Sequence, residues 1–567
     1  MHQNITRYGF LASYIYPALA LFLIPVVSLA LFSLIESQRH ASVSASFYAP
    51  AIRGGIYTSW FCILGGIGAF LFAGISVLGS LWSQRAQYYS LLLGWYGLRM
   101  FCTLEVIAQA LLLFGVACML PIVLPSGFAI KILVFVGVVC AGAAVAVVAS
   151  VFQKMEHKFE INGIVLSRKR APALWEDLEQ LSAKLNTAPP DQVVAGIDDN
   201  FFVTQMPVIV RDGKNKPKMH TGRTLFVSLA LLKKLRGREA DAVLLHELAH
   251  FSGNDTLFSQ KIAPLLARYD RYLEALHDGF VSRPIFYFAI LFRALFEVSL
   301  GRQSREREFR ADRLAAEQTS SQDMAHALLR VTAYSKYRHE LEKEFFTAEE
   351  AHEQVNLSER IEEGFRAYAS AFIDSGDVGQ LITSHPFDSH PPLVSRLRAL
   401  RYNARKSVVR AVLCDDSNGT WYPKIIDAAK LEQEQWSAYE EGFREFHQRE
   451  LAYRYLPSTA KEQELVEKFF PACKLMLVDG KRIQLDFEKM MCDDWGRPLY
   501  FREVTEISLT ESSILVKFER NGRKREEHLL FSKLEQEKQV LIASIEAFYV
   551  RATAAIAYQQ SHAQQNT

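Results

Sequence analysis

The residues best suited to chemistry lie in one short segment, Arg238–His250, which reads READAVLLHELAH. The segment is rich in good helix formers, and on a helix two side chains four positions apart lie on one face. His246 and His250 can therefore offer two imidazoles to one metal ion, at the bond lengths of about 2.0–2.1 Å that zinc prefers. Glu247 lies about 100° further round the helix, where its carboxylate can reach a metal-bound water and act as a general base. An HExxH motif arises by chance only about 0.02 times in a chain of this composition.

A catalytic zinc site takes three protein ligands and keeps a fourth position open, so a third ligand is expected further along the chain. Glu308 is the preferred candidate, because Asp312 follows it by one helical turn and could accept a hydrogen bond from the outer nitrogen of a ligating histidine. Glu306 is the competing ligand, but Arg310 holds the corresponding position after it and cannot accept such a bond. The sequence therefore predicts one catalytic Zn2+ ion, with Asp312 supporting its ligands.

The HELAH motif followed by EFRAD at residues 308–312 resembles the HtpX-like and CAAX-prenyl-protease-like membrane zinc metallopeptidases. The resemblance covers about residues 155–402. It implies an α+β zincin-like (gluzincin) protease domain and an enzyme that is a zinc metalloendopeptidase, in which Glu247 activates a zinc-bound water.

Two softer matches within this region imply further site residues. The segment 200–204, which begins with Asn200, Phe201 and Phe202, matches an edge strand that binds the substrate backbone, and residues 224–228 match the strand that leads into the zinc helix. His390, in the segment HPFDSHPPLVSRL, matches a histidine that helps to stabilise the transition state, and His385 is the less favoured match.

The elements before this domain are apolar. Four runs, at about 14–35, 57–82, 101–124 and 128–152, reach the roughly 20 residues that a helix needs to cross a bilayer. The first run is too long for a signal peptide and lacks a convincing cleavage site. Four crossings place the N-terminus and everything after residue 152 on one side, and the excess of Lys and Arg in the flanks on that side predicts that it is cytoplasmic. Glu105, near one end of the third run, is interpreted as an end residue that reaches the lipid headgroups, so no site is assigned there.

The apolar stretch Ile285–Leu300 needs a separate argument. A single crossing here would put Glu308 about 30 Å from His246, across the bilayer. Zinc bonds of about 2 Å forbid that separation. The stretch also contains Arg293 and Glu297, and the charged segment 257–276 makes a poor second span. We therefore expect an interfacial or core helix rather than a crossing.

The remaining chain is predicted to form a helical connector, residues 404–465, with one long helix at 426–454, and then a small sheet-plus-helix domain with a polar tail, residues 466–567. Five short strands are expected there, at 474–478, 482–487, 504–509, 513–518 and 526–531, with a helix at about 533–555. This arrangement resembles pleckstrin-homology-like modules, and a binding or substrate-presenting role is the default. The predicted chain thus has four parts: a transmembrane region at 1–152, a protease domain at 153–403, the connector and the C-terminal domain.

Composition restricts the function further. The formal net charge of +2 gives no electrostatic basis for binding nucleic acid, and the seven scattered cysteines give no disulfide framework. The sequence predicts a multi-pass, membrane-bound, zinc-dependent endopeptidase that cuts membrane or membrane-proximal proteins, with protein quality control as a candidate setting. Its partners are then protein or peptide substrates and the lipid bilayer. An inactive binding or scaffold protein on the same fold, and a processing protease for lipidated substrates, are the alternatives. The substrate, the cleavage preference, the oligomeric state and the regulatory partners do not follow from the sequence.

Overall fold

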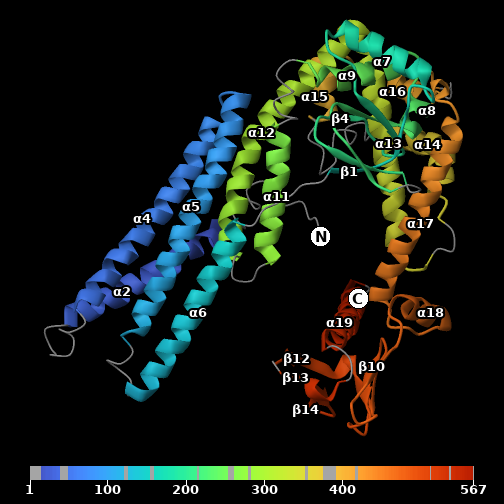
Figure 1. The fold of residues 1–567 in the computed structure, drawn as a ribbon. Coiled ribbons are helices and arrows are strands. Elements are labelled where there is room, and N and C mark those ends of the chain that lie inside the picture. The colour runs from blue at the N-terminus through green and yellow to red at the C-terminus, as the bar shows by residue number, and fades with distance from the viewer. Residues whose placement is uncertain are drawn as a thin grey trace. The chain divides into compact units, whose positions relative to one another are not determined.

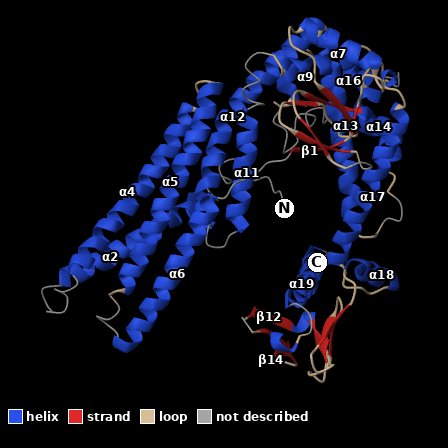
Figure 2. Cartoon of the chain, viewed as in Figure 1, coloured by secondary structure: helices blue, strands red, loops and turns tan. Residues whose placement is uncertain are grey.

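The computed structural model describes residues 15–38, 49–119, 126–152, 159–212, 216–252, 261–278, 283–351, 355–374, 391–415, 419–510, 512–534 and 538–565. The chain forms two compact units. The first contains Met1–Lys336 and Arg366–Glu432, and the second contains Tyr337–Phe365 and Gln433–Thr567. Figure 2 shows that each unit combines helices with strands.

Long apolar helices begin the first unit (Figure 1). They are α2 (Leu23–Gln38), which follows the short η1 (Ala20–Phe22), α4 (Ala49–Gly79), α5 (Gln84–Ala117) and α6 (Ser126–Phe152). The helix α4 packs on α2 and α5, and α5 also packs on α6. Many of their large apolar side chains are exposed, as expected for a surface that faces lipid.

Each predicted apolar run overlaps one of these helices, but the bounds differ: α4 ends at Gly79, before the predicted end at 82, and α5 begins well before residue 101 and ends at Ala117. The predicted turn at Pro125 lies outside the described residues. Among the described helices, five are long and apolar enough to cross a membrane by length and composition. The fifth is Lys538–Ser561, within α19 (Lys538–Gln565) of the second unit.

Two further helices pack against this bundle. They are α11 (Ala263–Asp278) and α12 (Arg283–Gln318), which lie side by side (Figure 1). Phe288, Phe292 and Phe296 of α12 are buried in a core shared with α4, α5 and α11. The stretch 285–300 therefore forms part of a core, in agreement with the expected interfacial or core helix, and α11, which contains most of the charged segment 257–276, packs beside it. Neither α11 nor α12 is among the described helices that are long and apolar enough to cross a membrane. The chain leaves along α11 and returns along α12, which continues unbroken to the residues around Glu308.

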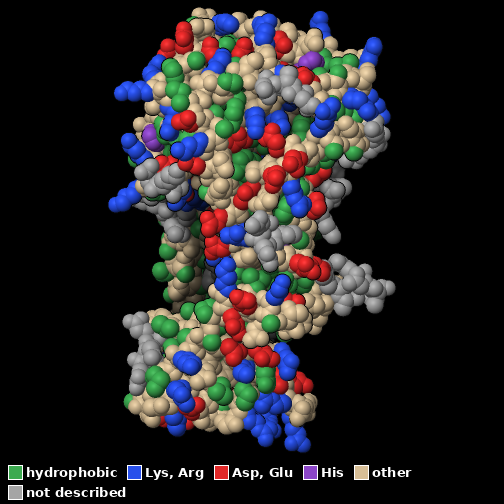
Figure 3. Space-filling model, turned by 90° about the vertical axis from the view of Figure 1, so that its right-hand side faces the viewer, with side chains coloured by type: hydrophobic (Ala, Val, Ile, Leu, Met, Phe, Trp, Pro, Cys, Tyr) green, Lys and Arg blue, Asp and Glu red, His purple; other side chains and the backbone are tan. Residues whose placement is uncertain are grey.

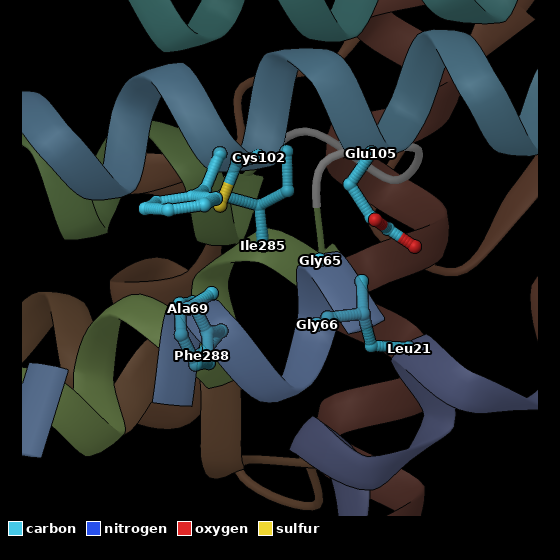
Figure 4. A pocket seen from close by; sticks show the side chains of 9 residues that line it. Leu21, Gly65, Gly66, Ala69, Cys102, Glu105, Ile285 and Phe288 are labelled. Atoms are coloured by element: carbon cyan, nitrogen blue, oxygen red, sulfur yellow. The ribbon is translucent and has the colours of Figure 1, made fainter. Parts of the chain in front are cut away.

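A narrow apolar pocket lies inside this bundle and is lined in part by Gly65, Gly66, Cys102 and Glu105 (Figure 4). The carboxylate of Glu105 points into it, and the amide of Gln109 donates a 2.7 Å hydrogen bond to this carboxylate. Glu105 is buried rather than directed to headgroups, so the interpretation of this residue as an interfacial end residue was wrong.

The part of the chain between α6 and α9 contains two small sheets. One has the strand order β2-β3-β7-β4, with β3 and β7 parallel and the outer strands antiparallel to their neighbours. The other has the order β1-β5-β6. The strands are β1 (Phe159–Asn162), β2 (Ile164–Val165), β3 (Gln192–Gly196), β4 (Phe202–Thr204), β5 (Val208–Arg211), β6 (Lys218–His220) and β7 (Thr224–Ser228).

Helices surround these sheets. Those of the first unit are α7 (Pro172–Lys184), α8 (Leu229–Lys234), α9 (Glu239–Ala249), α15 (Leu393–Ala399) and α16 (Lys406–Leu413), with the 3-10 turn η6 (Tyr422–Lys424). Three longer helices have residues in both units: α13 (Ser321–Thr347), α14 (Leu357–Asp374) and α17 (Ala428–Arg454). The predicted helix at 426–454 corresponds to α17.

The second unit contains α18 (Ala460–Phe469), two antiparallel sheets and α19. The sheet orders are β11-β10-β9-β8 and β12-β13-β14. The strands are β8 (Cys473–Met476), β9 (Arg482–Leu485), β10 (Lys489–Cys492), β11 (Leu499–Tyr500), β12 (Val504–Leu509), β13 (Ser513–Arg520) and β14 (Arg523–Leu530). Five of them lie where the sequence predicts strands, and β10 and β11 were not predicted. One apolar face of α19 packs into the core of both sheets through Leu541, Ile545 and Phe548.

Candidate metal centre

The helix α9 carries the two predicted histidines. The strand β7 leads toward it through the short helix α8, whose first turn is capped by the hydroxyl of Ser228. Every residue of α9 except Asp241 is buried, so the HExxH motif lies inside the domain rather than on its surface. His250 is the C-cap of α9. The Nε2 atoms of His246 and His250 lie 3.3 Å apart, as their spacing on one helical face requires.

The helix α12 packs against α9 and brings Glu308 to these histidines. One carboxylate oxygen of Glu308 lies 3.4 Å from Nε2 of His246 and the other lies 3.5 Å from Nε2 of His250. Glu306, the competing ligand, is exposed and lies 3.4 Å from Arg302 on the preceding turn. The geometry therefore brings Glu308, and not Glu306, to the two histidines.

These separations can be compared with what a metal ion requires. Tetrahedral coordination with bonds of about 2.0–2.1 Å places neighbouring ligand atoms about 3.3–3.4 Å apart. The separation of 3.3 Å between the two histidine nitrogens agrees with that value, and each nitrogen has one Glu308 oxygen at a similar distance, 3.4 or 3.5 Å. Two imidazoles and one carboxylate are also the donor types that catalytic zinc sites use. Among the described residues, His246, His250 and Glu308 are the one group of His, Cys, Asp and Glu that could hold a metal ion.

Asp312 lies one turn beyond Glu308 on α12 and faces His246. Its Oδ1 atom is 2.9 Å from Nδ1 of His246, so the imidazole can donate from Nδ1 and keep Nε2 free for a metal. Arg396 of α15 donates two hydrogen bonds to the same carboxylate, from Nη2 at 2.6 Å and from Nε at 2.8 Å. Asp312 and Arg396 are both buried, so this ion pair is shielded from solvent.

The pKa values in this network follow from burial and charge. Burial would lower the pKa of His246, but its contacts with Asp312 and Glu308 outweigh burial and raise the pKa to about 10. Burial would raise the pKa of Asp312, yet Arg396 and His246 hold it well below its usual value. Asp312 is therefore an anion, and the metal-free site keeps His246 protonated at neutral pH.

Residues 218–404 match the model of Peptidase family M48. These residues, about a third of the chain, are therefore similar to that family. The chain is 28% identical over 191 residues to the protease HtpX homolog of Bordetella avium, an alignment that covers 31% of this chain and 55% of that protein. It is 27% identical over 247 residues to protease HtpX of Cellvibrio japonicus, an alignment that covers 41% of this chain and 71% of that protein. The chain spans about half the length of most of the curated relatives it matches. No solved structure matches significantly.

The other predicted site residues are placed as follows. Glu247 is buried on α9, one position after His246. Phe202 begins β4, which is the outer strand of its sheet among the described residues, and Asn200 and Phe201 directly precede it. The ring of Phe202 stacks on Phe226 of β7 with centroids 4.8 Å apart. His390 and His385 lie outside the described residues.

Sequence reasoning missed three residues that support the site. Arg396 lies within the segment that suggested His390, but only the fold shows that it meets Asp312. Trp421 donates a 2.6 Å hydrogen bond to Asp241 on the first turn of α9, and Arg330 of α13 donates a 2.7 Å hydrogen bond to Glu239 on the same turn. Neither of the last two lies in a recognisable motif, because both reach α9 from distant parts of the chain.

Proposed function

We propose that this chain is a membrane-bound, zinc-dependent endopeptidase that hydrolyses peptide bonds of membrane or membrane-proximal proteins, with protein quality control as its setting. The observation that carries the proposal is the convergence of His246, His250 and Glu308, at separations that suit one tetrahedral metal ion. The M48 match over the same residues and the apolar helices before them support it.

Each residue of the site has a distinct role in this proposal. A zinc ion held by His246, His250 and Glu308 would polarise the scissile carbonyl and make a water more acidic. Glu247 takes the proton of the attacking water and passes it to the leaving amine. His390 donates a hydrogen bond to the oxyanion. Asp312 keeps the proton of His246 on Nδ1.

The substrate is proposed to bind as an added strand beside β4. Asn200, Phe201 and Phe202 would contact its backbone, because β4 is an outer strand and also contacts α9. Main-chain hydrogen bonds supply most of the affinity in this mode, so the enzyme would make few demands on side chains near the cut bond.

The decisive experiment compares zinc content and degradation of a membrane-protein substrate in four forms of the purified full chain. The wild type should hold one zinc ion and degrade the substrate. Glu308→Ala should lose both properties, whereas Glu306→Ala, two residues earlier on the same helix, should keep both. Glu247→Ala should keep zinc and lose degradation.

Each contrary result has a definite meaning. Full zinc content in Glu308→Ala would refute the ligand set, and retained degradation in Glu247→Ala would refute the mechanism. A wild type that binds zinc but cuts nothing would refute the peptidase function and leave a scaffold protein.

We also propose the division of the chain into a transmembrane region at 1–152, a protease domain at 153–403, a connector at 404–465 and a C-terminal domain at 466–567, with the protease domain on the cytoplasmic side. Single reporter cysteines placed at exposed Lys184 and exposed Arg53 in a cysteine-free chain test the orientation. In right-side-out vesicles, an impermeant thiol reagent should label only the cysteine at position 53, and labelling at position 184 would reverse the assignment.

A further inference from the structure

The second unit presents the edge of a sheet. The strand β14 (Arg523–Leu530) pairs along its whole length with β13, and in the described part of the chain no strand pairs with its other side. An unpaired edge of eight residues offers a row of backbone N–H and C=O groups to which an extended peptide can add. The edge is therefore able to bind a peptide backbone.

A pocket of about 310 Å³ adjoins the end of this strand. Three consecutive residues of β14 line it, namely His528, Leu529 and Leu530, so the pocket borders the strand itself. Leu477, Cys492, Asp494 and Trp495 come from the opposite sheet and its turns, and Lys533 lies in the 3-10 turn that follows β14.

The pocket has an apolar floor and a polar rim. Leu477, Cys492 and Leu529 are each less than 5% exposed and form the floor. Beside them, the backbone N–H of Val478 donates a 2.9 Å hydrogen bond to the carbonyl of Lys533, which joins the segment after β8 to the turn after β14. The volume lies at the lower end of the roughly 300–1,000 Å³ typical of ligand pockets, which suits one apolar side chain better than a large cofactor.

The other end of β14 carries positive charge. Arg523, Lys524 and Arg525 are consecutive and exposed, and none of them forms an ion pair with a described residue. On the neighbouring strand, by contrast, Lys517 is paired with Glu506 and Arg520 with Glu503. Figure 3 shows Lys and Arg side chains gathered on the surface of the unit that holds these sheets. Three unpaired cations beside an open strand edge favour an acidic ligand.

We propose that β14 and its pocket bind an extended, acidic peptide segment of another protein. The peptide adds to β14 as a further strand, places one apolar side chain in the pocket beside Trp495, and lays acidic side chains along Arg523–Arg525. From Leu529 to Arg525 the strand covers four residues. This distance is about 13 Å at the rise of an extended chain, so the apolar residue and the first acidic residue should be about four positions apart.

The test uses the full chain in detergent with the Glu247→Ala substitution, so that the probe is not cut. Two fluorescein-labelled decapeptides serve as probes, one with a leucine four residues before an Asp-Glu-Asp run and one with the reverse order, which covers antiparallel and parallel addition. We expect one of them to bind in a fluorescence anisotropy titration. The same peptide N-methylated at alternate backbone nitrogens should bind at least tenfold more weakly, because strand addition needs those N–H groups.

Variants of the protein separate the two recognition elements. Trp495→Ser should weaken binding about tenfold or more, as expected for an aromatic anchor. The double variant Lys524→Glu, Arg525→Glu should weaken binding and remove its dependence on salt. Lys461→Glu, on the exposed surface of α18, is the control for charge reversal and should leave binding unchanged.

Three outcomes would overturn the proposal. The first is that neither peptide binds. The second is that the N-methylated peptide binds as well as its parent. The third is that the protein instead captures vesicles containing 30% phosphatidylserine, that this capture requires Lys524 and Arg525, and that Trp495→Ser has no effect on it. This result would show that the basic edge contacts lipid.

Discussion

Arg396 and Asp312 form a buried ion pair in which two hydrogen bonds, 2.6 and 2.8 Å long, fix the carboxylate against the outer nitrogen of His246. The pair connects α15 to the candidate metal centre through His246. Its geometry sets the tautomer of His246, because the Nδ1 proton has an anionic acceptor at 2.9 Å. A residue that does not contact the metal thus determines whether one of the ligands can bind it.

Replacing Arg396 with lysine should therefore weaken zinc binding. A lysine keeps the positive charge but cannot form the two parallel hydrogen bonds that orient Asp312. We expect zinc affinity to fall about 10–100-fold, the usual effect of losing an outer partner of a metal ligand. Competition with a fluorescent chelator measures the change. Arg398→Lys, at an exposed position of the same helix, is the control, and equal affinities for the two variants would contradict the role assigned to Arg396.

The ion pair at the start of α9 should matter for stability rather than for metal chemistry. Arg330 and Glu239 are both buried and lie 2.7 Å apart. Arg330→Met leaves the carboxylate buried beside an apolar side chain, which should lower the free energy of unfolding by about 3–5 kcal/mol. Chemical denaturation of the zinc-loaded chain measures this loss.

A second substitution tests the cause of that loss. In the double variant Glu239→Gln, Arg330→Met, the buried charge is gone and part of the stability should return. The exposed Arg313→Met is the control for removing an arginine, and a double variant no more stable than Arg330→Met would show that the charge is not responsible.

The parts of the site that the sequence predicts are those that depend on local periodicity. His246 and His250 are four residues apart on one helix, and so are Glu308 and Asp312, so helical geometry alone places each pair on one face. That the two helices meet depends on α12 packing along the membrane helices, which no local pattern encodes. The charges in 257–276 argued only against a second membrane span, and the sequence does not show that α11 packs on α12, where Asp270 meets Arg293 at 2.9 Å.

The other residues and strands that the sequence did not predict also depend on tertiary packing or lack a recognisable local pattern. Arg396 and Arg330 reach the site from distant segments, so only the tertiary fold reveals them. In the second unit, β11 has only two residues, too short for an alternating pattern to be recognised. β10 was also missed, although its four residues equal the lengths of β8 and β9, which were predicted. Glu105 was misjudged because its position near the end of an apolar run suggested headgroups, whereas the packing of α5 turns it inward.

Zinc binding should release a proton from the protein. In the metal-free chain His246 has a pKa of about 10, above its ordinary value of 6.5, so it is protonated at pH 7.5 and must lose that proton to bind the metal. Calorimetric titrations in buffers of different ionisation enthalpy should show release of about one proton. The apparent zinc affinity should rise with pH between 6.5 and 10, and an affinity that does not change over this range would contradict the prediction.

The same shift predicts how the metal-free chain responds to pH. Because the pKa of His246 is raised on folding, its contribution to stability is fully present below pH 6.5 and is lost as the pH rises toward 10. The metal-free chain should therefore lose stability over this range relative to Asp312→Asn, which lacks the carboxylate that keeps His246 protonated. Thermal unfolding of both forms at pH 6, 8 and 10 measures the difference.

A substitution in β3, which carries none of the proposed metal ligands, should impair the proposed substrate strand. A Cβ atom on Gly196 of β3 would lie 2.3 Å from the ring of Phe226, on which Phe202 of β4 stacks. Gly196→Ala therefore forces Phe226 to move and displaces β4, at a cost of about 1–3 kcal/mol in the free energy of unfolding.

Because β4 would hold the substrate while α9 and α12 hold the metal, we expect the KM for peptides to rise while zinc content stays at one ion per chain. Gly442→Ala, in α17 where nothing lies within 4 Å of the added carbon, is the matched control and should change neither quantity. Loss of zinc in Gly196→Ala would show that displacing β4 also disturbs the metal ligands. An unchanged KM would show that β4 does not bind the substrate.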